Sequence, residues 1–574
     1  MRRLIPCLLA TLVLAACQPN GDTAAPAGDA PAPAAANESR HAFQDAISAE
    51  DFAAHVERLA SDEFEGRGPG TTGEQKTVEY LKAQMERIGL QPGNDGEWYQ
   101  TVPMVETIAD DSTVLHLTVD GKPRELAFGE DMVIGTRTGQ QQVEIADSEL
   151  VFVGYGVDAP EQKWNDYAGV DVKGKTVVML VNDPGFHADD AALFEGKRMT
   201  YYGRWTYKFE EAARKGAAAA LVIHDTPGAS YGWDVVRNSW SGTQYDLPAS
   251  VDPAPRLPAQ GWISGEAAKS LFADAGLDLD QLRAAANKRG FKAVPLDATM
   301  SLDLASTISE TSSRNVVGML PGSARPDEAV LYMAHWDHLG KHDVDPAQPE
   351  ADVIYNGAVD NATGVAGVLE IAEAFASQDR KPERSLVFLA VTLEESGLLG
   401  SQYYVANPVV PLEKTVAVFN IDAMSVYGRS RDYTVVGMGS SELEDLLKKV
   451  ADGQGRTLHQ EAHPEAGGYF RSDHFNFAKA GVPALYVDGG DDLVDGGKAA
   501  GDAAARAYNE QRYHSPADEF DAASWKLGGT VEDLVALYTI GSELADSQQW
   551  PNWYEGNPFK ATRDLARSGA SAAQ

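Results

Sequence analysis

Cysteine is nearly absent from this chain of 574 residues, because the only two, Cys7 and Cys17, lie within the N-terminal stretch that ends at Cys17. The remainder of the chain therefore cannot form a disulfide, and no thiol there can act as a nucleophile or bind a metal. Any metal has to be held by histidine, aspartate and glutamate side chains. This restricts the chemistry that a functional site can use.

Positive charge is also scarce, with 48 lysine and arginine residues against 85 aspartate and glutamate residues and a formal net charge of -37. Nucleic acid and anionic membrane surfaces would repel such a chain, so we expect neither as a partner. Cationic ligands and metal ions fit this charge better. Acidity that only keeps a secreted protein soluble explains it equally well, since charge alone selects no ligand.

The one long apolar run at the N-terminus, Leu4 to Ala16, follows two arginines. It is too short to span a bilayer and is typical of an export signal. Its end, Leu14-Ala15-Ala16-Cys17, resembles the lipobox of bacterial lipoproteins, which implies a signal peptide over residues 1–17 and a lipid anchor on Cys17. Gln18 follows, so the resemblance implies an outer-membrane lipoprotein that faces the periplasm or the exterior and meets the membrane only through this anchor. A plain cleaved signal peptide is the alternative.

Composition divides the remaining chain into five segments. Residues 18–40 are rich in alanine, proline and glycine and are expected to be a disordered tether. Residues 41–104 contain two helical patterns, Ala49–Ala60 and Gly73–Ile88, and are interpreted as the first part of the domain that resumes at residue 305. Residues 105–304 show short β-type runs and indicate a β-rich insert. Residues 551–574 are expected to be a surface tail.

Residues 305–550 alternate apolar strand patterns with helical patterns. The strands are expected at Ala329–Ala334, Ser385–Thr392 and Thr415–Asn420, and a helix at Gly364–Ala376. Alternation at this spacing predicts an α/β fold, with a largely parallel mixed sheet between layers of helices.

Several runs in the insert, among them Phe152–Val157, Val172–Val177 and Ala212–Ala218, resemble the protease-associated (PA) domain. The resemblance implies a lid or substrate-access role without catalytic residues of its own. His187 and His224 fall in this segment and are expected to be surface or packing residues.

Each strand of residues 305–550 ends in a cluster of histidine or acidic residues. The clusters are His335-Trp336-Asp337-His338, Asp360-Asn361, Glu394-Glu395 and Asp422. The carboxyl ends of parallel strands meet at one edge of a sheet, where ligands gather. In this order, and with Arg512-Tyr513-His514-Ser515-Pro516 further on, the clusters resemble the M28 family of zinc exopeptidases, which includes aminopeptidases and glutamate carboxypeptidases. The resemblance implies the three-layer zinc-exopeptidase fold.

Carried over to this chain, the resemblance implies two zinc ions per chain with five protein ligands. It assigns His335 and Asp422 to one ion, Glu395 and His514 to the other, and Asp360 as the carboxylate that bridges them. Glu394 becomes the general base. Two divalent ions about 3.5 to 4 Å apart need a shared carboxylate between them, which agrees with this set. His338 competes with His335 as a ligand, but the spacing of the family motif favours His335.

The resemblance also implies roles for residues near the ligands. Asp337 is expected to accept a hydrogen bond from His335 and so orient its ring. Tyr513 is expected to stabilise the oxyanion, with a buried structural tyrosine as the alternative. His474 is expected to be a wall of the pocket or to support the ligands from behind. Related enzymes have a cis peptide bond after the bridging aspartate, so one is expected between Asp360 and Asn361.

The function that these expectations favour is hydrolysis of terminal peptide bonds in small peptides from the amino end. Carboxypeptidase action of the glutamate carboxypeptidase type is the alternative, and it needs a cationic cluster for which Arg471 and Arg512 are candidates. A glutaminyl cyclase with one zinc ion and a binding protein that kept the fold are further alternatives. A serine hydrolase fits poorly, because Gly437–Ser441 lacks the nucleophile-elbow pattern. The sequence does not disclose the oligomeric state, the native metal or the preferred side chain.

Overall fold

The computed structural model describes residues 41–188, 190–342, 344, 346 and 349–569. The predicted export signal, the lipid site at Cys17 and the tether over residues 18–40 lie outside these residues. From Phe43 onward the chain forms one compact unit. Within the described ranges, no helix combines the length and the apolar character needed to cross a membrane.

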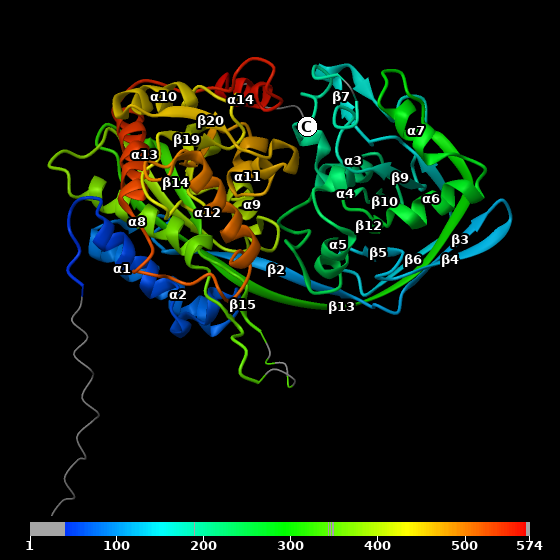
Figure 1. Ribbon diagram of the computed structural model, residues 1–574, viewed down its shortest axis with the longest axis horizontal. Helices are drawn as coiled ribbons and strands as arrows, with labels where there is room; N and C mark the ends of the chain where they lie inside the picture. The colour runs from blue at the N-terminus through cyan, green and yellow to red at the C-terminus, as the bar shows by residue number, and fades with distance from the viewer. Residues whose placement is uncertain (1–40, 189, 343, 345, 347–348, 570–574) are drawn as a thin grey trace, which may run out of the picture. The chain divides into compact units, whose positions relative to one another are not determined.

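A largely parallel mixed sheet forms the centre of the second half of the chain (Figure 1). Strand β14 (Arg325–His335) lies between β17 (Arg384–Val391) and β18 (Thr415–Asn420) and is parallel to both. Strand β21 (Ala484–Gly489) continues the sheet in parallel beside β18. These strands were expected from their apolar runs, and the α/β fold class is confirmed.

Antiparallel strands complete this sheet at both sides. They are β13 (Val294–Leu320), which pairs with β17 and with the short β1 (Gln91–Pro92), and β19 (Asp432–Val435), which pairs with β21 and, in parallel, with β20 (Thr457–Gln460). The separate hairpin of β15 (Gly340–Lys341) and β16 (Ile354–Tyr355) follows β14.

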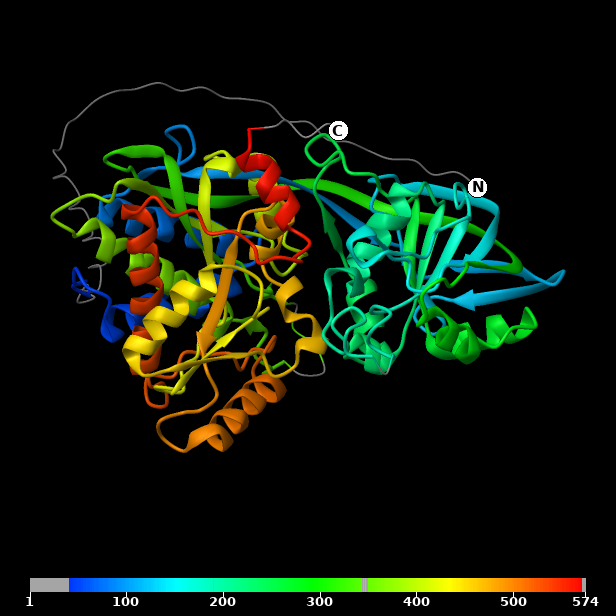
Figure 2. The ribbon, with the colours of Figure 1, turned by 90° about the horizontal axis from the view of Figure 1, so that it is seen from above.

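Helices pack against this sheet. Helix α8 (Thr363–Ala376) is buried over almost its whole length and contacts β14 on one side and α1 (Ala49–Leu59) and α2 (Thr72–Ile88) on the other. In Figures 1 and 2 the orange-red α13 (Gly528–Asp546) runs beside the same sheet. The remaining helices of this part are α9 (Leu399–Ala406), α10 (Leu443–Gln454), α11 (His474–Lys479) and α12 (Gly497–Gln511).

The N-terminal helices begin and end where their sequence predicts. The side chain of Ser48 caps α1 by accepting the Asp51 N–H at 3.0 Å, and Thr71 caps α2 by accepting the N–H of Gly73 at 3.0 Å. Gly89 ends α2 in the left-handed region with φ 89°. These helices therefore dock on α8 and support the segment that precedes it.

The insert has a sheet of its own, as its β-type runs predicted. The parallel strands β6 (Gln142–Phe152), β9 (Thr176–Leu180), β10 (Ala219–Ile223) and β12 (Ala259–Ile263) form its centre. Antiparallel partners are β5 (Met132–Gly135) beside β12, the first half of β13 beside β6, and β3 (Val114–Val119) with β4 (Lys122–Ala127). The resemblance to the PA domain stays a prediction.

Short elements complete the insert. They are β7 (Asp158–Ala159), β8 (Trp164–Asn165), β11 (Gln244–Asp246), α3 (Trp205–Arg214), α4 (Thr226–Ala229), α5 (Trp233–Trp240), α6 (Gly265–Asp274) and α7 (Leu279–Ala286).

The expected limits of the insert, residues 105 and 304, fall inside strands. Strand β2 (Tyr99–Ala109) runs through residue 105, and β13 is a single strand of 27 residues that runs through residue 304. The two strands pair with each other in an antiparallel register from Tyr99 with Val316 to Ala109 with Ser306. Two continuous strands therefore connect the insert to the rest of the fold, in place of flexible linkers.

The expectation of a surface tail from residue 551 is wrong for the described residues 551–569. Trp553 is buried and its Nε1 donates to the carbonyl of Gly481 at 2.9 Å. Helix α14 (Lys560–Arg567) places the buried Arg563 against β18, where its guanidinium donates to the carbonyls of Thr415 at 3.0 Å and Val416 at 3.1 Å. Because these aromatic and guanidinium groups are buried, the segment belongs to the core.

Candidate metal centre

Five side chains converge at the carboxyl edge of the central sheet, where the parallel strands end. His335 is the last residue of β14, Glu395 follows β17, and Asp422 follows β18. Asp360 lies in the turn that leads into α8, and His514 lies shortly after α12. The sheet topology brings together residues that are far apart in the sequence, as expected for this type of fold.

The turn that presents Asp360 has an unusual backbone. The Asp360–Asn361 peptide bond is cis, which confirms the expectation. Gly357 precedes it with φ 53°, and a Cβ atom at this position would lie 2.2 Å from the carbonyl oxygen of Asp360. Only glycine fits so close an approach of backbone to backbone.

Asn361 ties this turn to the loop of the next ligand. Its Nδ2 donates to the carbonyl of Ile421 at 3.0 Å, and its Oδ1 accepts the N–H of Ala423 at 3.1 Å. These two residues flank Asp422. Asn361 therefore fixes the Asp360 turn relative to Asp422.

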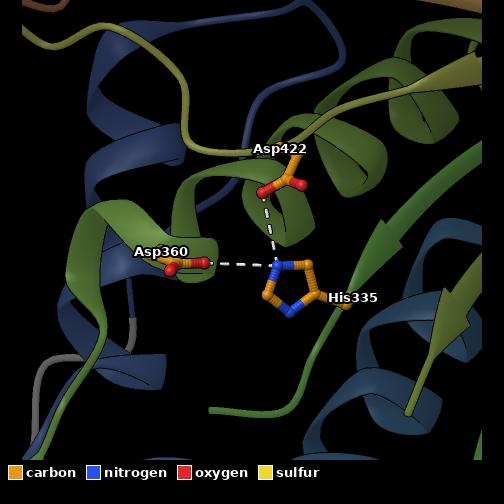
Figure 3. A group of neighbouring side chains, drawn as sticks. All are labelled: His335, Asp360 and Asp422. Atoms are coloured by element: carbon orange, nitrogen blue, oxygen red, sulfur yellow. Dashed lines mark hydrogen bonds and ion pairs between the residues drawn. The ribbon is translucent and has the colours of Figure 1, made fainter. Parts of the chain in front are cut away.

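His335, Asp360 and Asp422 form the first group of the centre. Nε2 of His335 lies 3.2 Å from Oδ1 of Asp360 and 3.3 Å from Oδ1 of Asp422. Figure 3 shows the imidazole facing both carboxylates. Ligand atoms of the three residues lie within 4.8 Å of one another, which is a spacing that one metal ion can bridge.

The second group uses the other oxygen of Asp360. Nε2 of His514 lies 3.3 Å from Oδ2 of Asp360 and 3.2 Å from Oε2 of Glu395. Asp360 therefore directs one carboxylate oxygen to each group, as a carboxylate that bridges two ions would.

His338 is a further candidate in the second group. Its Nδ1 lies 2.7 Å from Oε1 of Glu395, and ligand atoms of His338, Asp360 and Glu395 also lie within 4.8 Å of one another. The sequence suggested that His338 competes with His335, but the structure places it beside Glu395. We favour His514 as the ligand, because one nitrogen of His514 faces both carboxylates, whereas His338 forms a short hydrogen bond to Glu395 and is placed to orient it.

Zinc fits the chemistry of these residues, which offer only imidazole nitrogens and carboxylate oxygens. Two further carboxylates, Asp337 and Asp473, are fully buried nearby, and the Oδ2 atom of each has no hydrogen-bond partner among the described residues. The pKa of each carboxyl group is raised to about 7, mainly by burial and also by neighbouring carboxylates, including Glu395, against the opposing effect of His335. So dense an arrangement of acidic groups favours cations between them.

Glu394, the predicted general base, is held by the backbone next to the ligands. Its N–H donates to Oδ1 of Asp337 at 3.2 Å. Burial raises the pKa of its carboxyl group well above the usual value, and the carboxylates of Glu395 and Asp422 raise it further, against the opposing effect of His335. A carboxyl group with a raised pKa suits proton transfer near neutral pH.

The contact between His335 and Asp337 differs from the expected one. Nδ1 of His335 donates to the backbone carbonyl of Asp337 at 3.1 Å, whereas the nearer carboxylate oxygen lies 3.8 Å away. The ring is therefore oriented by the main chain of Asp337. Its carboxylate instead accepts the N–H of Glu394.

His474 and Tyr513, which were also predicted to lie near the ligands, differ in how far they are buried. His474 is buried between the rings of Tyr469 and Tyr486, with centroids 4.6 and 5.3 Å away, and burial lowers its pKa to about 3. It supports the aromatic packing behind Asp422. Tyr513 is 47% exposed and its ring stacks on that of His514 at 3.8 Å, so the alternative of a buried tyrosine is wrong.

Sequence reasoning missed three residues that hold the centre together. Ser472 donates its hydroxyl to Oδ2 of Asp422 at 2.5 Å, and Asp518 accepts the backbone N–H of Asp360 at 3.1 Å. The third is Arg67, which is fully buried. The signals in the sequence were the glycine-rich turn around Arg67, the resemblance of Ser472-Asp473-His474 to a family segment near the pocket, and the short spacing from His514 to Asp518.

Arg67 joins three segments of backbone through its guanidinium group. It donates to the carbonyls of Leu59 at 2.9 Å, Trp336 at 2.9 Å, Asn356 at 2.6 Å and Gly357 at 2.8 Å. Burial lowers its pKa to about 10, so it stays positively charged at neutral pH. It therefore fixes the residue after His335 to the turn before Asp360.

With this geometry established, the comparisons with known proteins become informative. Residues 315–539 match the sequence profile of Peptidase family M28. This segment is similar to M28 peptidases. All five converging residues and Glu394 lie within it, whereas the N-terminal helices and the whole insert, residues 105–304, lie outside it.

Relatives with known names match parts of the same region. The chain is 31% identical to leupeptin-inactivating enzyme 1 of Streptomyces exfoliatus over 37% of this chain and 48% of that protein. It is 29% identical to aminopeptidase NAALADL1 of Mus musculus over 27% of this chain and 19% of that protein. The matches thus span between about a fifth and a half of these relatives' lengths.

Solved structures that are similar over most of the chain include an aminopeptidase. The aminopeptidase from Aneurinibacillus sp. strain AM-1 covers 88% of this chain and 95% of its own, at 18% identity and a TM-score of 0.47.

Proposed function

We propose that this chain is an exopeptidase with two zinc ions, which hydrolyses the amino-terminal peptide bond of small peptides. The observation that carries the proposal is the position of Asp360, whose two carboxylate oxygens face His335 on one side and His514 on the other. Asp422 and Glu395 complete the two groups. The match of this segment to a peptidase family supports the same reaction.

Two zinc ions held by these residues would polarise the scissile carbonyl and lower the pKa of a bound water molecule. Glu394 would take a proton from the attacking water through its carboxylate. The water oxygen would form a bond to the carbonyl carbon as the π electrons of the carbonyl move to its oxygen. The carbon–nitrogen bond then breaks, and Glu394 passes the proton to the nitrogen of the leaving amine. The phenol of Tyr513 would donate to the developing oxyanion, and the support for this role is the stacking of its ring on that of the predicted ligand His514 at 3.8 Å.

The acidic surroundings favour a substrate with a free α-amine, because an ammonium group is attracted by carboxylates that lie close together. The experiment compares cleavage of a free dipeptide with cleavage of its N-acetylated form. We expect acetylation to lower kcat/KM by at least about 100-fold, which corresponds to about 3 kcal/mol. Equal cleavage of both forms would contradict aminopeptidase action.

A carboxypeptidase is the second candidate, and one observation favours it. Burial, and then the positive charge of Arg471, lower the pKa of Arg204 to about 10, so the two guanidinium groups act on each other electrostatically. Such a pair would bind the carboxylate of a substrate's C-terminus. Arg512, the other arginine considered from sequence, is engaged with the backbone, because its Nε donates to the carbonyl of Ala517 at 3.0 Å. A C-terminally amidated peptide that is no longer cleaved would favour this candidate.

A glutaminyl cyclase would hold a single zinc ion, so it is separated from these candidates by the metal content. Measurement of about one zinc ion per chain, together with release of pyroglutamyl product from an N-terminal glutamine peptide, would favour the cyclase over the peptidase.

We also propose that the chain is exported and anchored to the outer membrane through a lipid on Cys17, with residues 18–40 as a tether. The support is the sequence Leu14-Ala15-Ala16-Cys17 after the apolar run. Metabolic labelling with a radioactive fatty acid in a bacterial host tests this proposal. We expect the wild-type chain to carry the label and the Cys17→Ala variant to carry none. Equal labelling of the two chains would contradict the proposed lipid anchor.

The PA-like insert is proposed to restrict the access of substrates to the centre. The support is its contact with two loops of the peptidase-like segment. The N–H of Met199 donates to the carbonyl of Pro464 at 3.2 Å in the loop before Ser472, and Arg198 donates to the carbonyl of Met438 at 2.9 Å in the loop after β19. Cleavage of a dipeptide and of a long peptide by the wild type and by Arg198→Ala tests this role. A gain in long-peptide cleavage alone is expected, and no change in the ratio of the two rates would contradict it.

A further inference from the structure

The turn that presents Asp360 is held from outside by a single buried carboxylate. Oδ2 of Asp518 accepts the backbone N–H of Asp360 at 3.1 Å, and Oδ1 accepts that of Val359 at 3.1 Å. The backbone carbonyl of Asp518 accepts the N–H of Ala358 at 3.0 Å. Three successive residues of the turn therefore depend on Asp518, which is fully buried.

The guanidinium group of Arg67 holds the opposite side of the same turn. Arg67 donates to the carbonyls of Asn356 and Gly357, just before the three N–H groups that Asp518 accepts. The negative charge of Asp518 raises the pKa of the Arg67 guanidinium, whereas burial lowers it. The turn is thus fixed between a buried anion at its N–H groups and a buried cation at its carbonyls.

Asp518 also belongs to the loop of another predicted ligand. His514 precedes it by one short turn, in which the N–H of Asp518 donates to the carbonyl of Ser515 at 3.1 Å. Nε of Arg512 closes this loop by donating to the carbonyl of Ala517 at 3.0 Å. Movement of Asp518 would therefore displace both His514 and Asp360.

We propose that Asp518 is a positioning residue, which couples the bridging carboxylate of Asp360 to the loop of His514 and so sets the geometry of the second metal position. The inference rests on the proposed two-zinc function. Asp518 does not touch the position of either ion through a contact described above; it acts through the backbone of Val359 and Asp360. The first position, formed by His335 and Asp422, depends on it only through the shared Asp360.

Asp518→Asn tests the coupling with almost no change in shape. An amide offers one acceptor oxygen, and its NH₂ group would face a backbone N–H, so at least one of the two backbone hydrogen bonds is lost. Second-sphere changes of this kind lower metal affinity by about 10- to 100-fold. We expect a loss of this size for the second zinc ion and a smaller loss for the first.

The measurement is a zinc titration of the purified, metal-free full chain, followed by peptide turnover at limiting and at excess zinc. The matched control is Asp521→Asn, the same substitution at an exposed residue of the same segment, whose carboxylate accepts local hydrogen bonds from Ala523 and Ser524. The control is expected to bind two ions as the wild type does. Turnover of Asp518→Asn is expected to fall at limiting zinc and to recover at excess zinc.

The outcomes separate the inference from the proposed function. If Asp518→Asn lowers the affinity for both zinc ions equally, or for neither, the inference is overturned. A wild-type chain that binds two ions leaves the proposed function intact in that case. A wild-type chain that binds fewer than two ions overturns both. Should Asp518→Asn fail to fold, Tyr508→Phe replaces it, because it removes only the hydroxyl that donates to Oδ2 of Asp518 at 3.3 Å. Weaker binding of the second ion is again expected, and unchanged affinity overturns the inference.

Discussion

The backbone N–H of Glu394 donates to the carboxylate of Asp337, with 3.2 Å between the nitrogen and Oδ1. This hydrogen bond connects the segment after β17 to the segment after β14. Glu394, which precedes the predicted ligand Glu395, is therefore held by Asp337, two positions after the predicted ligand His335. Asp337 thereby contributes to the position of Glu394, the proposed general base, as well as to that of His335.

Replacement of Glu394 by glutamine should abolish turnover without removing the metals. An amide cannot take a proton from water, and general-base catalysis contributes about 100- to 10,000-fold. We expect kcat to fall by this factor while the zinc content stays that of the wild type. Glu413→Gln, at an exposed glutamate, serves as the control and should keep full activity. A Glu394→Gln enzyme with wild-type kcat would exclude Glu394 as the base.

Loss of the Arg67 side chain should destabilise the whole fold. Arg67→Met leaves the four carbonyls that the guanidinium binds without their donor, and a buried acceptor without a partner costs about 1 to 3 kcal/mol. We expect the free energy of unfolding in urea to fall by at least ~3 kcal/mol. Arg67→Lys keeps the positive charge but offers fewer hydrogen-bond donors. Its free energy of unfolding should therefore lie between those of Arg67→Met and the wild type. Values for Arg67→Met within about 1 kcal/mol of the wild type would contradict the role of Arg67.

Stability should depend on pH through Glu370, which is buried where α1 packs on α8 and accepts the N–H of Ser48 at 2.8 Å. Burial, and then the nearby Asp51 and Glu373, raise its pKa to about 8, against about 4.5 in the unfolded chain. Between these pH values the folded state binds a proton that the unfolded state has lost, so this group's contribution to stability falls as pH rises from about 4.5 to about 8.

Glu370→Gln removes this loss, because its side chain stays neutral. The unfolding midpoint of the variant relative to the wild type should therefore rise between pH 5 and pH 9. Glu57→Gln, at an exposed position of α1, should show no such trend. A midpoint difference that is the same at both pH values would show that Glu370 ionises normally in the folded chain.

Removal of residues 551–574 should destabilise the chain, contrary to what a surface tail would predict. The deletion exposes the site of the buried Trp553 and removes the Arg563 guanidinium from the carbonyls of β18. Loss of a buried tryptophan alone costs about 3 to 5 kcal/mol. Thermal unfolding of a chain that ends at residue 550 is compared with one that ends at residue 569. Equal midpoints for the two chains would restore the idea of a tail.

The sequence was sufficient for the fold class and for the residues that gather at the centre. Apolar runs predicted β14, β17 and β18, and the clusters that follow them supplied His335 and Asp422 in the order that the family resemblance requires. This succeeded because parallel strands bring their carboxyl ends to one edge whatever the rest of the chain does.

Other features could not be predicted, for physical reasons. Arg67 and Asp518 act on backbone carbonyls and N–H groups, which every residue has, so no side-chain pattern marks their partners. The limits of the insert were misplaced because β13 is continuous through residue 304 and has no turn there. The segment after residue 551 was misjudged because the burial of Trp553 depends on a surface that distant residues form.

The most direct test of the two-ion centre is a crystal of the zinc-loaded chain measured at the zinc absorption edge. We predict two anomalous peaks about 3.5 to 4 Å apart, with one oxygen of Asp360 directed to each. The peak near Asp422 should also contact His335, and the other should contact Glu395 and His514. A single peak, or peaks that Asp360 does not bridge, would contradict the two-zinc mechanism.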